Sequence, residues 1–145
     1  MKRHPDLQRL SRDHHQALVV ARRLKHVNDE EAIAARAAFL EFWHRHGQLH
    51  FRIEEEVLLP DFALAGGAED PAVARVLHEH AEIRLRALQL QGGAGSVPVQ
   101  QALGELLAGH IRFEEGELFP TIEATLSPEQ LNGMASALAT GERGS

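Results

Sequence analysis

Cysteine and tyrosine are both absent from this chain, and it has a single tryptophan. Without cysteine the protein forms no disulfide, iron–sulfur cluster or thiolate zinc site, which leaves histidine and carboxylate as its strong metal ligands. Aromatic residues make up only 5% of the sequence although 43% of it is hydrophobic. The core must therefore be built mainly from aliphatic side chains, which suits packed helices better than a β-sandwich.

Further absences narrow the set of partners. No basic run or aromatic-interleaved stripe is present among the fifteen Lys and Arg residues, and the net charge is −6, so we expect no nucleic-acid partner. No stretch approaches the ~20 apolar residues of a membrane span, and the N-terminus MKRHPDLQRL lacks the apolar segment of a signal peptide. We expect no membrane partner, a cytoplasmic location and a single domain over residues 1–145.

Turn signals mark the first two of four long amphipathic segments. The first segment is expected to begin near Pro5 and to end near Val27, because its apolar residues recur at helical spacing. Asn28 followed by Glu31 has the pattern of a capping box that opens the second helix. Pro60 is expected to kink or end that helix, because proline lacks a backbone N–H and clashes with the preceding turn.

The next two segments have equally clear boundaries. After the predicted loop ALAGGAED, Asp70 and Pro71 provide an N-cap and a first-turn proline for the third helix, which Gly92 should end. The fourth helix is expected to run from Pro98 until Pro120.

Four helices of similar length joined by short loops pack most simply as an all-α, antiparallel up-down-up-down four-helix bundle, here over about residues 5–125. Ser127 and Gln130 form a second capping-box pattern, which predicts a short C-terminal fifth helix over about 128–140. Traced at helical spacing, the inward faces of the bundle are expected to include Ile33, Leu77 and Leu106.

A repeated segment carries the clearest functional signal. HFRIEEEVLLP (50–60) recurs as HIRFEEGELFP (110–120). In each copy a histidine precedes a glutamate by four residues, His50 before Glu54 and His110 before Glu114, which places imidazole and carboxylate on one helix face. Both copies lie near the ends of helices that run in the same direction, so the two pairs are expected at the same level of the bundle, where they would hold metal.

The first and third helices offer histidines at that level. His80 continues the apolar stripe of its helix, whereas His78 lies two residues away and about 200° round the helix. His14 continues the apolar series of the first helix, and His15 would replace it if that helix were rotated. His46, one turn before His50, is a further candidate for a ligand or for a hydrogen-bonding partner of one.

These choices predict a two-metal site with one histidine from each helix and two bridging carboxylates. Mixed nitrogen and oxygen donors suit a pair of iron ions, with zinc or manganese as alternatives, and metal would compensate carboxylates that are costly to bury. The role of Glu79 stays open. The predicted ligands are His14, His50, Glu54, His80, His110 and Glu114. The acids expected to remain solvated are Glu55, Glu56, Glu115 and Glu117, with Arg52 or Arg112 one turn away from three of them.

The segments LSRDHHQAL, HFRIEEEVLLP, HEHAEI and HIRFEEGELFP resemble the hemerythrin-like, or HHE cation-binding, family over roughly residues 5–125. The resemblance implies a four-helix bundle with a non-haem di-iron centre, in which the four histidines are terminal ligands and Glu54 and Glu114 bridge the irons.

Two departures separate this chain from the oxygen-carrying members of that family. Those members hold one iron with an HxxxH pair on the third helix, but the residues four away from His80 here are Val76 and Arg84. They also place an aspartate five residues after the histidine of the second motif, where this chain has Glu114 after four. The chain therefore looks closer to the four-histidine, two-glutamate members linked to nitric-oxide or oxidative stress and iron-centre repair.

These features favour oxygen, nitric oxide or peroxide as the ligand, with an apolar wall of Trp43, Leu106 and Phe113 controlling access. No nucleophilic arrangement or separate general base is recognisable, so we expect a metal-binding sensor, store or scavenger before an enzyme. A zinc-stapled or metal-free interaction module and a labile iron store or donor are the alternatives. A redox partner and a homo-oligomer stay open.

Overall fold

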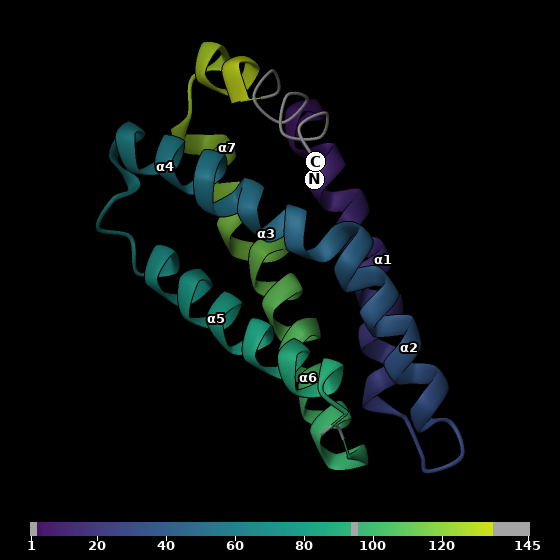
Figure 1. Cartoon of the computed structure of the whole chain (residues 1–145). Coiled ribbons are helices and arrows are strands. Elements are labelled where there is room, and N and C mark those ends of the chain that lie inside the picture. The colour runs from purple at the N-terminus through teal and green to yellow at the C-terminus, as the bar shows by residue number, and fades with distance from the viewer. Residues whose placement is uncertain (1–2, 94–95, 135–145) are drawn as a thin grey trace.

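Helices make up all the regular structure of the residues described by the computed structural model, 3–93 and 96–134 (Figure 1). The predicted all-α class is confirmed. In chain order the elements are a 3-10 turn (Pro5–Leu7), α1 (Gln8–Lys25), α2 (Ala32–Phe42), α3 (Gln48–Ile53), α4 (Leu59–Phe62), α5 (Pro71–Gln91), α6 (Val97–Phe113) and α7 (Phe119–Thr125). Residues 128–134 are also helical.

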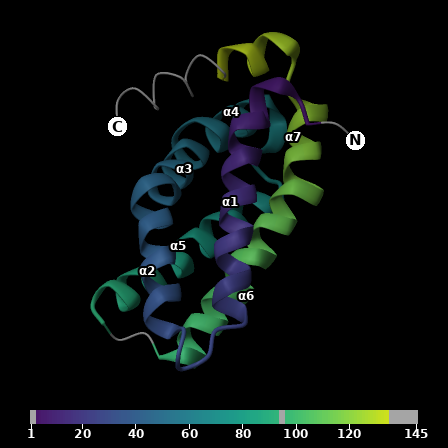
Figure 2. The same ribbon diagram turned by 90° about the vertical axis from the view of Figure 1, so that its right-hand side faces the viewer.

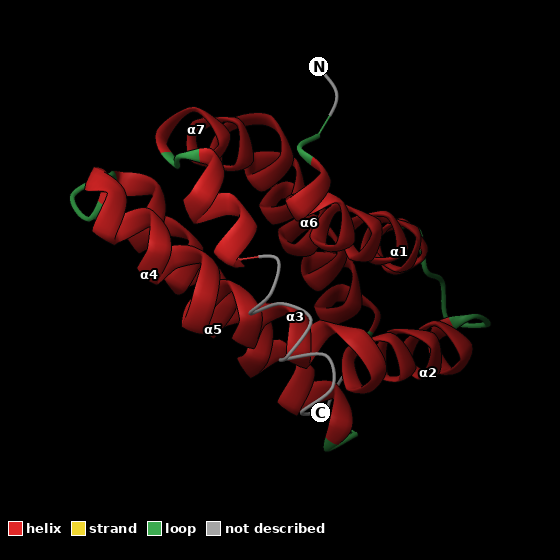
Figure 3. Ribbon diagram, turned by 90° about the horizontal axis from the view of Figure 1, so that it is seen from above, coloured by secondary structure: helices red, strands yellow, loops and turns green. Residues whose placement is uncertain are grey.

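These elements form four antiparallel rods in up-down-up-down order, because α2–α4 follow one another as one rod and α6–α7 as another (Figures 1 and 2). The rod of α1 packs against α2 and α6, and the rod of α5 packs against the same two neighbours. The rods of α1 and α5 therefore lie on opposite sides of the bundle, as the view from above shows (Figure 3). No helix in the described ranges is long and apolar enough to cross a membrane.

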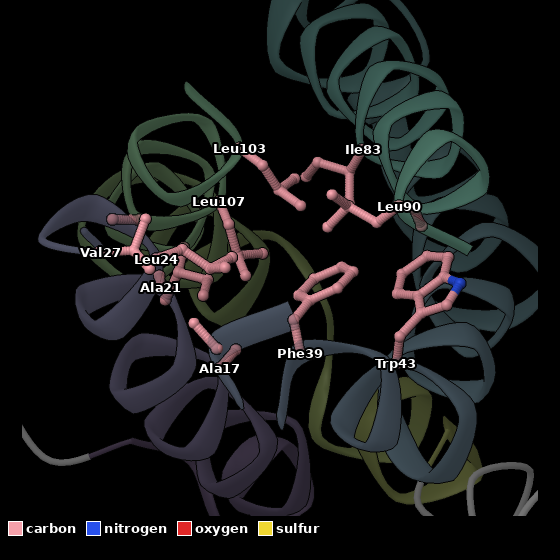
Figure 4. Packing of buried hydrophobic residues seen from close by; sticks show 14 of the residues in the cluster. Ala17, Ala21, Leu24, Val27, Phe39, Trp43, Ile83, Leu90, Leu103 and Leu107 are labelled. Carbon is pink, nitrogen blue, oxygen red and sulfur yellow. The ribbon is translucent and has the colours of Figure 1, made fainter. Parts of the chain in front are cut away.

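The apolar core is divided into two clusters. One joins α1, α2, α5 and α6, where Phe39 and Trp43 face leucines of the neighbouring rods (Figure 4). The other is built around Leu58, Phe62 and Phe119 at the opposite end of the bundle. Along each rod the predicted metal ligands fall between the residues of these two clusters, so the candidate site is a polar layer within an otherwise apolar interior.

Pro60 does not end its helix, and the fourth helix does not stop at Pro120 as predicted, since both rods continue beyond the proline. A π-helical turn precedes each proline, over Glu54–Leu58 in the first copy of the repeat and Glu114–Leu118 in the second. Such a turn bonds each N–H to the carbonyl five residues back, which changes the ladder at the place where proline has no N–H to offer. Each π-helical turn also begins at a predicted metal ligand.

The capping predictions fare better. The Asn28 side chain accepts a hydrogen bond from the N–H of Glu31, but residues 29–31 form a turn and α2 begins only at Ala32, later than predicted. Asp70 is the N-cap of α5 and accepts a bond from the N–H of Ala72. Ser127 and Gln130 form the reciprocal capping box of the fifth helix, which is helical over 128–134 and whose predicted remainder lies outside the described residues. The segment predicted as the loop ALAGGAED is still helical over Ala63–Gly67, and the rod is interrupted there at Gly66, where φ is +113°.

Two predicted inward residues are misplaced. Ile33 is 82% exposed and Leu77 is 45% exposed, whereas Leu106 is partly buried and packs against the core. In α2 the inward positions belong to Ala35 and Phe39.

Gly104 explains how closely α1 and α6 approach each other. A Cβ atom at this position would lie 2.7 Å from the carbonyl oxygen of Ala21 and from the backbone nitrogen of Lys25. Because backbone atoms cannot yield as a flexible side chain does, only glycine allows this contact.

Candidate metal centre

The structure brings together all six side chains that the sequence predicts as metal ligands. None of them is more than 4% exposed. They form two groups, in each of which one potential ligand atom per residue lies within 4.8 Å of the others. The first group consists of His14, His50, Glu54 and Glu114, and the second consists of His80, His110, Glu54 and Glu114. Both carboxylates thus belong to both groups.

Glu54 lies between the two histidine pairs. Its Oε2 atom is 3.0 Å from Nε2 of His50. Its Oε1 atom is 2.9 Å from Nε2 of His80, which belongs to the other pair. A carboxylate whose two oxygens approach different histidine pairs has the arrangement of a ligand that bridges two ions.

Glu114 holds the corresponding position from α6 and its following turn. Its Oε1 atom is 2.8 Å from Nε2 of His14 and 3.5 Å from Nε2 of His110. The two imidazoles of the first pair also meet at Nε2, with 3.1 Å between the nitrogens of His14 and His50. All four histidines therefore direct Nε2 towards the shared carboxylates.

In each of the four histidines of the centre, the other ring nitrogen, Nδ1, contacts a carboxylate that is not one of the six predicted ligands. Nδ1 of His14 is 2.6 Å from Glu115, and Nδ1 of His80 is 2.6 Å from Glu55. A carboxylate ion only accepts hydrogen bonds, so Nδ1–H is the donor and Nε2 keeps its lone pair for a metal when the ring is neutral. This is the arrangement in which carboxylates orient metal-binding histidines.

The remaining two histidines follow the same rule with acids from α1 and α5. Nδ1 of His50 is 3.1 Å from Asp13, and Nδ1 of His110 is 2.9 Å from Glu79. Glu79 is thus a partner of a candidate ligand and does not enter either metal-capable group. The four pairs have approximate two-fold symmetry, because Asp13 and Glu79 act within their own half of the chain whereas Glu55 and Glu115 reach across to the other half.

The prediction that Glu55 and Glu115 are solvated is wrong. Besides binding histidine, Glu55 accepts two hydrogen bonds from the guanidinium of Arg84, at 2.8 and 3.1 Å. Glu115 accepts a bond from the hydroxyl of Ser11 at 2.8 Å and lies 3.4 Å from the guanidinium of Arg3. The sequence did contain a signal for this role, because the second glutamate of the Glu-Glu pair is present in both copies of the repeat, as the first is.

Arg3 also binds a backbone carbonyl that Pro120 leaves without a helical hydrogen bond in the second copy. Its Nη2 atom donates to the backbone carbonyl of Glu115 at 2.7 Å. That carbonyl lies five residues before Pro120, which has no N–H to bond with it. The same guanidinium donates to Glu123 at 2.7 Å and lies over the ring of Phe119.

The other acids of the repeat remain outside the centre. Glu56 is exposed and pairs with Arg52 at 3.1 Å, as predicted, and Glu117 is exposed. His15 and His46, the two alternative histidines, are both exposed and belong to neither metal-capable group. Helical phase thus selected the inward member of each pair of neighbouring histidines.

Protonation couples the imidazoles to the two central carboxylates. Burial opposes a charge on His50, but the charge of Glu54 and hydrogen bonds to Asp13 and Glu54 outweigh it and raise the pKa to about 9. Burial also opposes charge on His14 and His110, yet contacts with Glu114 and the outer acids raise the pKa of both.

The two carboxylates respond in opposite directions. Burial would raise the pKa of Glu54, but the charge of His50 and hydrogen bonds from three histidines hold it well below its usual range. Burial and the neighbouring charge of Glu54 raise the pKa of Glu114. Without a cation, protons on the imidazoles are therefore what balances the buried negative charge.

The hydrogen-bond inventory supports a cation in this layer. Among the described residues, five buried atoms of the centre have no partner in good hydrogen-bond geometry, even where, as between Glu54 and His80, a nitrogen and an oxygen lie close together. They are Oε1 of Glu54, Nε2 of His80, Nε2 of His110 and both carboxylate oxygens of Glu114. Leaving such atoms unpaired is costly, and one metal-ligand interaction would satisfy each of them. The donor set therefore fits two metal ions.

A narrow cavity adjoins one side of the centre. It is bounded by His14, His50 and His110 together with apolar side chains from α1, α2, α3 and α6, among them Trp43, Leu107 and Ile111. Trp43 thus lies where the sequence placed it, but the predicted wall residues Leu106 and Phe113 do not bound this space. Phe113 instead packs in the cluster at the other end of the bundle, beneath the guanidinium of Arg75.

Comparison with known proteins agrees with the resemblance read from the motifs. The searches of the curated proteins and of the solved structures gave no match. A family model, the hemerythrin HHE cation-binding domain, matches residues 5–122. The matched range contains both copies of the repeat and all six residues of the buried centre. The chain therefore belongs to the hemerythrin HHE cation-binding domain family, and its buried histidine and glutamate groups indicate metal binding.

Proposed function

We propose that this protein holds two iron ions and binds oxygen, nitric oxide or peroxide at them, acting as a sensor or scavenger under oxidative or nitrosative stress. The terminal ligands are His14 and His50 for one ion and His80 and His110 for the other. Glu54 and Glu114 bridge the two ions. The observation that carries the proposal is that these two carboxylates belong to both metal-capable groups.

The donor set favours iron over the alternatives. Each group offers two imidazoles and two shared carboxylates, and such mixed nitrogen and oxygen ligation suits iron and leaves positions open. Structural zinc prefers a closed tetrahedral site, commonly with thiolates, and this chain has no cysteine. Iron at this site would supply electrons and vacant positions for a small ligand.

The surrounding protein supports a small ligand in particular. The cavity beside His14, His50 and His110 is bounded mostly by apolar side chains and has room for little more than one water-sized molecule, which disfavours larger substrates. Outside the ligands, the polar side chains nearest the centre are the four acids that hold Nδ1 of the histidines. These acids orient imidazoles, which favours a sensor or scavenger over an enzyme with its own acid–base machinery.

Nitric oxide binding to protein loaded anaerobically with ferrous iron tests this function. We expect an optical change in stopped-flow mixing that scales with bound iron and is smaller in His110→Ala, which removes a ligand from one of the two groups. Leu107→Phe, which places a larger side chain beside the cavity, should slow binding about tenfold or more, equivalent to ~1.4 kcal/mol in the barrier. Leu106→Phe alters a neighbouring leucine that does not bound the cavity, so it should bind at the wild-type rate.

Two results would overturn the proposal. Iron-loaded protein that gives no optical change with nitric oxide, oxygen or peroxide would leave an iron store or a structural site as the better account. Tight binding of zinc with rejection of iron would point to a stapled interaction module.

A further inference from the structure

An exposed apolar stripe runs along the outer face of α5. Six large hydrophobic side chains are exposed in the described ranges, and three of them lie on this helix: Leu77, Leu85 (55% exposed) and Leu88 (65% exposed). The other three, Val19, Ile33 and Leu64, lie singly on other parts of the bundle. Ala74 and Ala81 are exposed between and beside the three leucines. Clustering of this kind marks an interaction surface, whereas single exposed residues do not.

The five residues share one narrow face. At about 100° per residue, the other four lie within about 40° of the direction of Ala81. The buried residues of α5 lie at least about 100° round the helix from Ala81. Ile83 and Leu90 in the core are nearly opposite, and His80 at the metal centre is the nearest of them. None of the five stripe residues belongs to either apolar core cluster.

Ala74, Leu77, Ala81, Leu85 and Leu88 are separated by three, four, four and three residues. This order reads the same in both directions about Ala81. If two α5 helices pack antiparallel with Ala81 facing itself, Leu77 of one copy faces Leu85 of the other, and Ala74 faces Leu88. Leucine then contacts leucine at two levels of the interface, alanine contacts leucine at its two ends, and alanine contacts alanine at the two-fold axis.

The charged residues beside the stripe suit the same arrangement. His78 and Glu82 lie on one flank of the stripe, and their side chains are 2.9 Å apart within one copy. In the antiparallel pair, His78 of one copy and Glu82 of the other differ in height along the helix axis by about 3 Å. Arg84 lies nearest the other flank, but its charge is already engaged by Glu55. Glu82 comes close in level to its own copy as well, and a protonated His78 imidazole beside it offsets that charge.

We infer that α5 is the contact surface of a homodimer in which two copies of this chain pack antiparallel about a two-fold axis at Ala81. The contact is isologous, since each copy contributes the same stripe. It places the metal centres on the far side of each α5 from the partner. The inference does not rest on the proposed iron, because none of the five stripe residues belongs to the metal-capable groups.

Sedimentation equilibrium tests for the dimer. The wild-type chain of 16.0 kDa should sediment at twice that mass. Because both copies contribute Leu85 to an isologous contact, Leu85→Glu places two charges in the interface. It should raise the dimer dissociation constant by about a hundredfold or more. Ile33→Glu adds the same charge to an exposed residue on α2 and should leave the dimer intact. Because Leu85 is exposed in the monomer, the variant should keep its helical circular dichroism and its metal content.

Disulfide trapping tests the orientation, since the natural chain has no cysteine to interfere. In Ala81→Cys the two introduced thiols face each other, so oxidised glutathione should join them by accepting two electrons and two protons. Ala74→Cys should not link to itself, because about 20 Å separates the two copies of that residue along the axis, but it should link to Leu88→Cys when the two proteins are mixed. A wild-type monomer at all concentrations, equal effects of the two glutamate variants, or self-linking of Ala74→Cys as fast as that of Ala81→Cys would overturn the inference.

Discussion

The two copies of the repeated segment occupy equivalent places in the centre but meet different neighbours. Glu54 and Glu114 both lie between the histidine pairs, and Glu55 and Glu115 each hold Nδ1 of a histidine from the other half. The arginine that holds Glu55 is Arg84 of α5. The one that approaches Glu115 is in the segment before the first helix.

The aromatic contacts also differ. Phe51 of the first copy stacks on His80 at 3.7 Å between ring centres, and Ile111 stands at the matching place of the second copy. Phe119 of the second copy stacks on His14 at 5.3 Å, where the first copy has Leu59. The repeated residues thus build a symmetric ligand set, while residues that do not repeat make its two halves unequal.

The largest expected effect comes from the residues that both halves share. Glu54→Gln or Glu114→Gln should lose both irons, falling from about two per chain to near zero, because each carboxylate serves both groups. His50→Ala or His80→Ala removes a ligand of one group only and should keep about one iron. Metal analysis of the purified variants, with Glu56→Gln as a matched exposed control, checks this order. A Glu54→Gln protein that keeps two irons would show that the carboxylate is not a bridge.

A smaller effect is expected from the acids that orient the histidines. Glu55→Gln and Glu115→Gln should weaken iron binding by about 10–100-fold, because each leaves the Nδ1–H of a ligand without its anionic partner. Glu56→Gln and Glu117→Gln change the next exposed acids of the two copies and should bind iron as the wild type does. Competition with a coloured chelator measures all four variants. Equal affinities in the first and second pairs of variants would mean that the outer acids are ordinary surface charges.

The metal-free protein should lose stability as the pH rises from 6.5 to 9. The pKa of His50 is about 9 in the fold against an ordinary value of 6.5, so its contribution to stability is complete below pH 6.5 and disappears as the pH passes 9. Glu54 does not offset this loss, since its lowered pKa gives a contribution that is lost only in acid. Thermal unfolding followed by circular dichroism measures the midpoint across this range.

Iron-loaded protein is the control for that experiment, because its imidazoles are held by metal instead of protons. Its midpoint should change less between pH 6.5 and 9 than that of the metal-free protein. A metal-free midpoint that rises over this interval would contradict the protonation scheme.

The smallest effects are expected from substitutions of the two arginines that pair with acids of the first copy, Arg52 and Arg84. Arg52 makes only an exposed pair with Glu56, so Arg52→Gln should change the free energy of unfolding by no more than about 0.5 kcal/mol. Arg84→Gln removes two hydrogen bonds from the acid that holds His80 and should weaken iron binding measurably, though by less than Glu55→Gln does. Urea unfolding and chelator competition on both variants test this ranking.

Helical phase and duplication together were enough to predict the six central residues. His14 lies at an apolar-series position and His15 does not, and that difference in phase matches the observed burial of one and exposure of the other. The same reasoning placed His80 inside and His78 outside. The cap at Asp70 was equally predictable, because caps depend only on neighbouring residues, whereas the Asn28 side chain bonds within a turn that precedes α2.

Features that depend on contacts between helices were not predictable in this way. The bond between Asp13 and His50 and that between Glu79 and His110 join different rods, so they follow from how the rods are rotated against each other. The inward stripe of α2 was traced at uniform spacing through the π-helical turn at Trp43–Gly47, which shifts the phase and explains the error at Ile33. Leu77 lies at the edge of its helical face, about 100° from the centre of the buried stripe.

Metal content, measured by inductively coupled plasma mass spectrometry together with an ultraviolet–visible spectrum, tests the central claim most directly. The protein should be expressed in iron-replete medium and purified without chelator or affinity tag. The account predicts about two irons per chain and a near-ultraviolet charge-transfer absorption. Zinc alone, or no metal after reconstitution with iron, would contradict the di-iron centre and leave only the helical fold of the family.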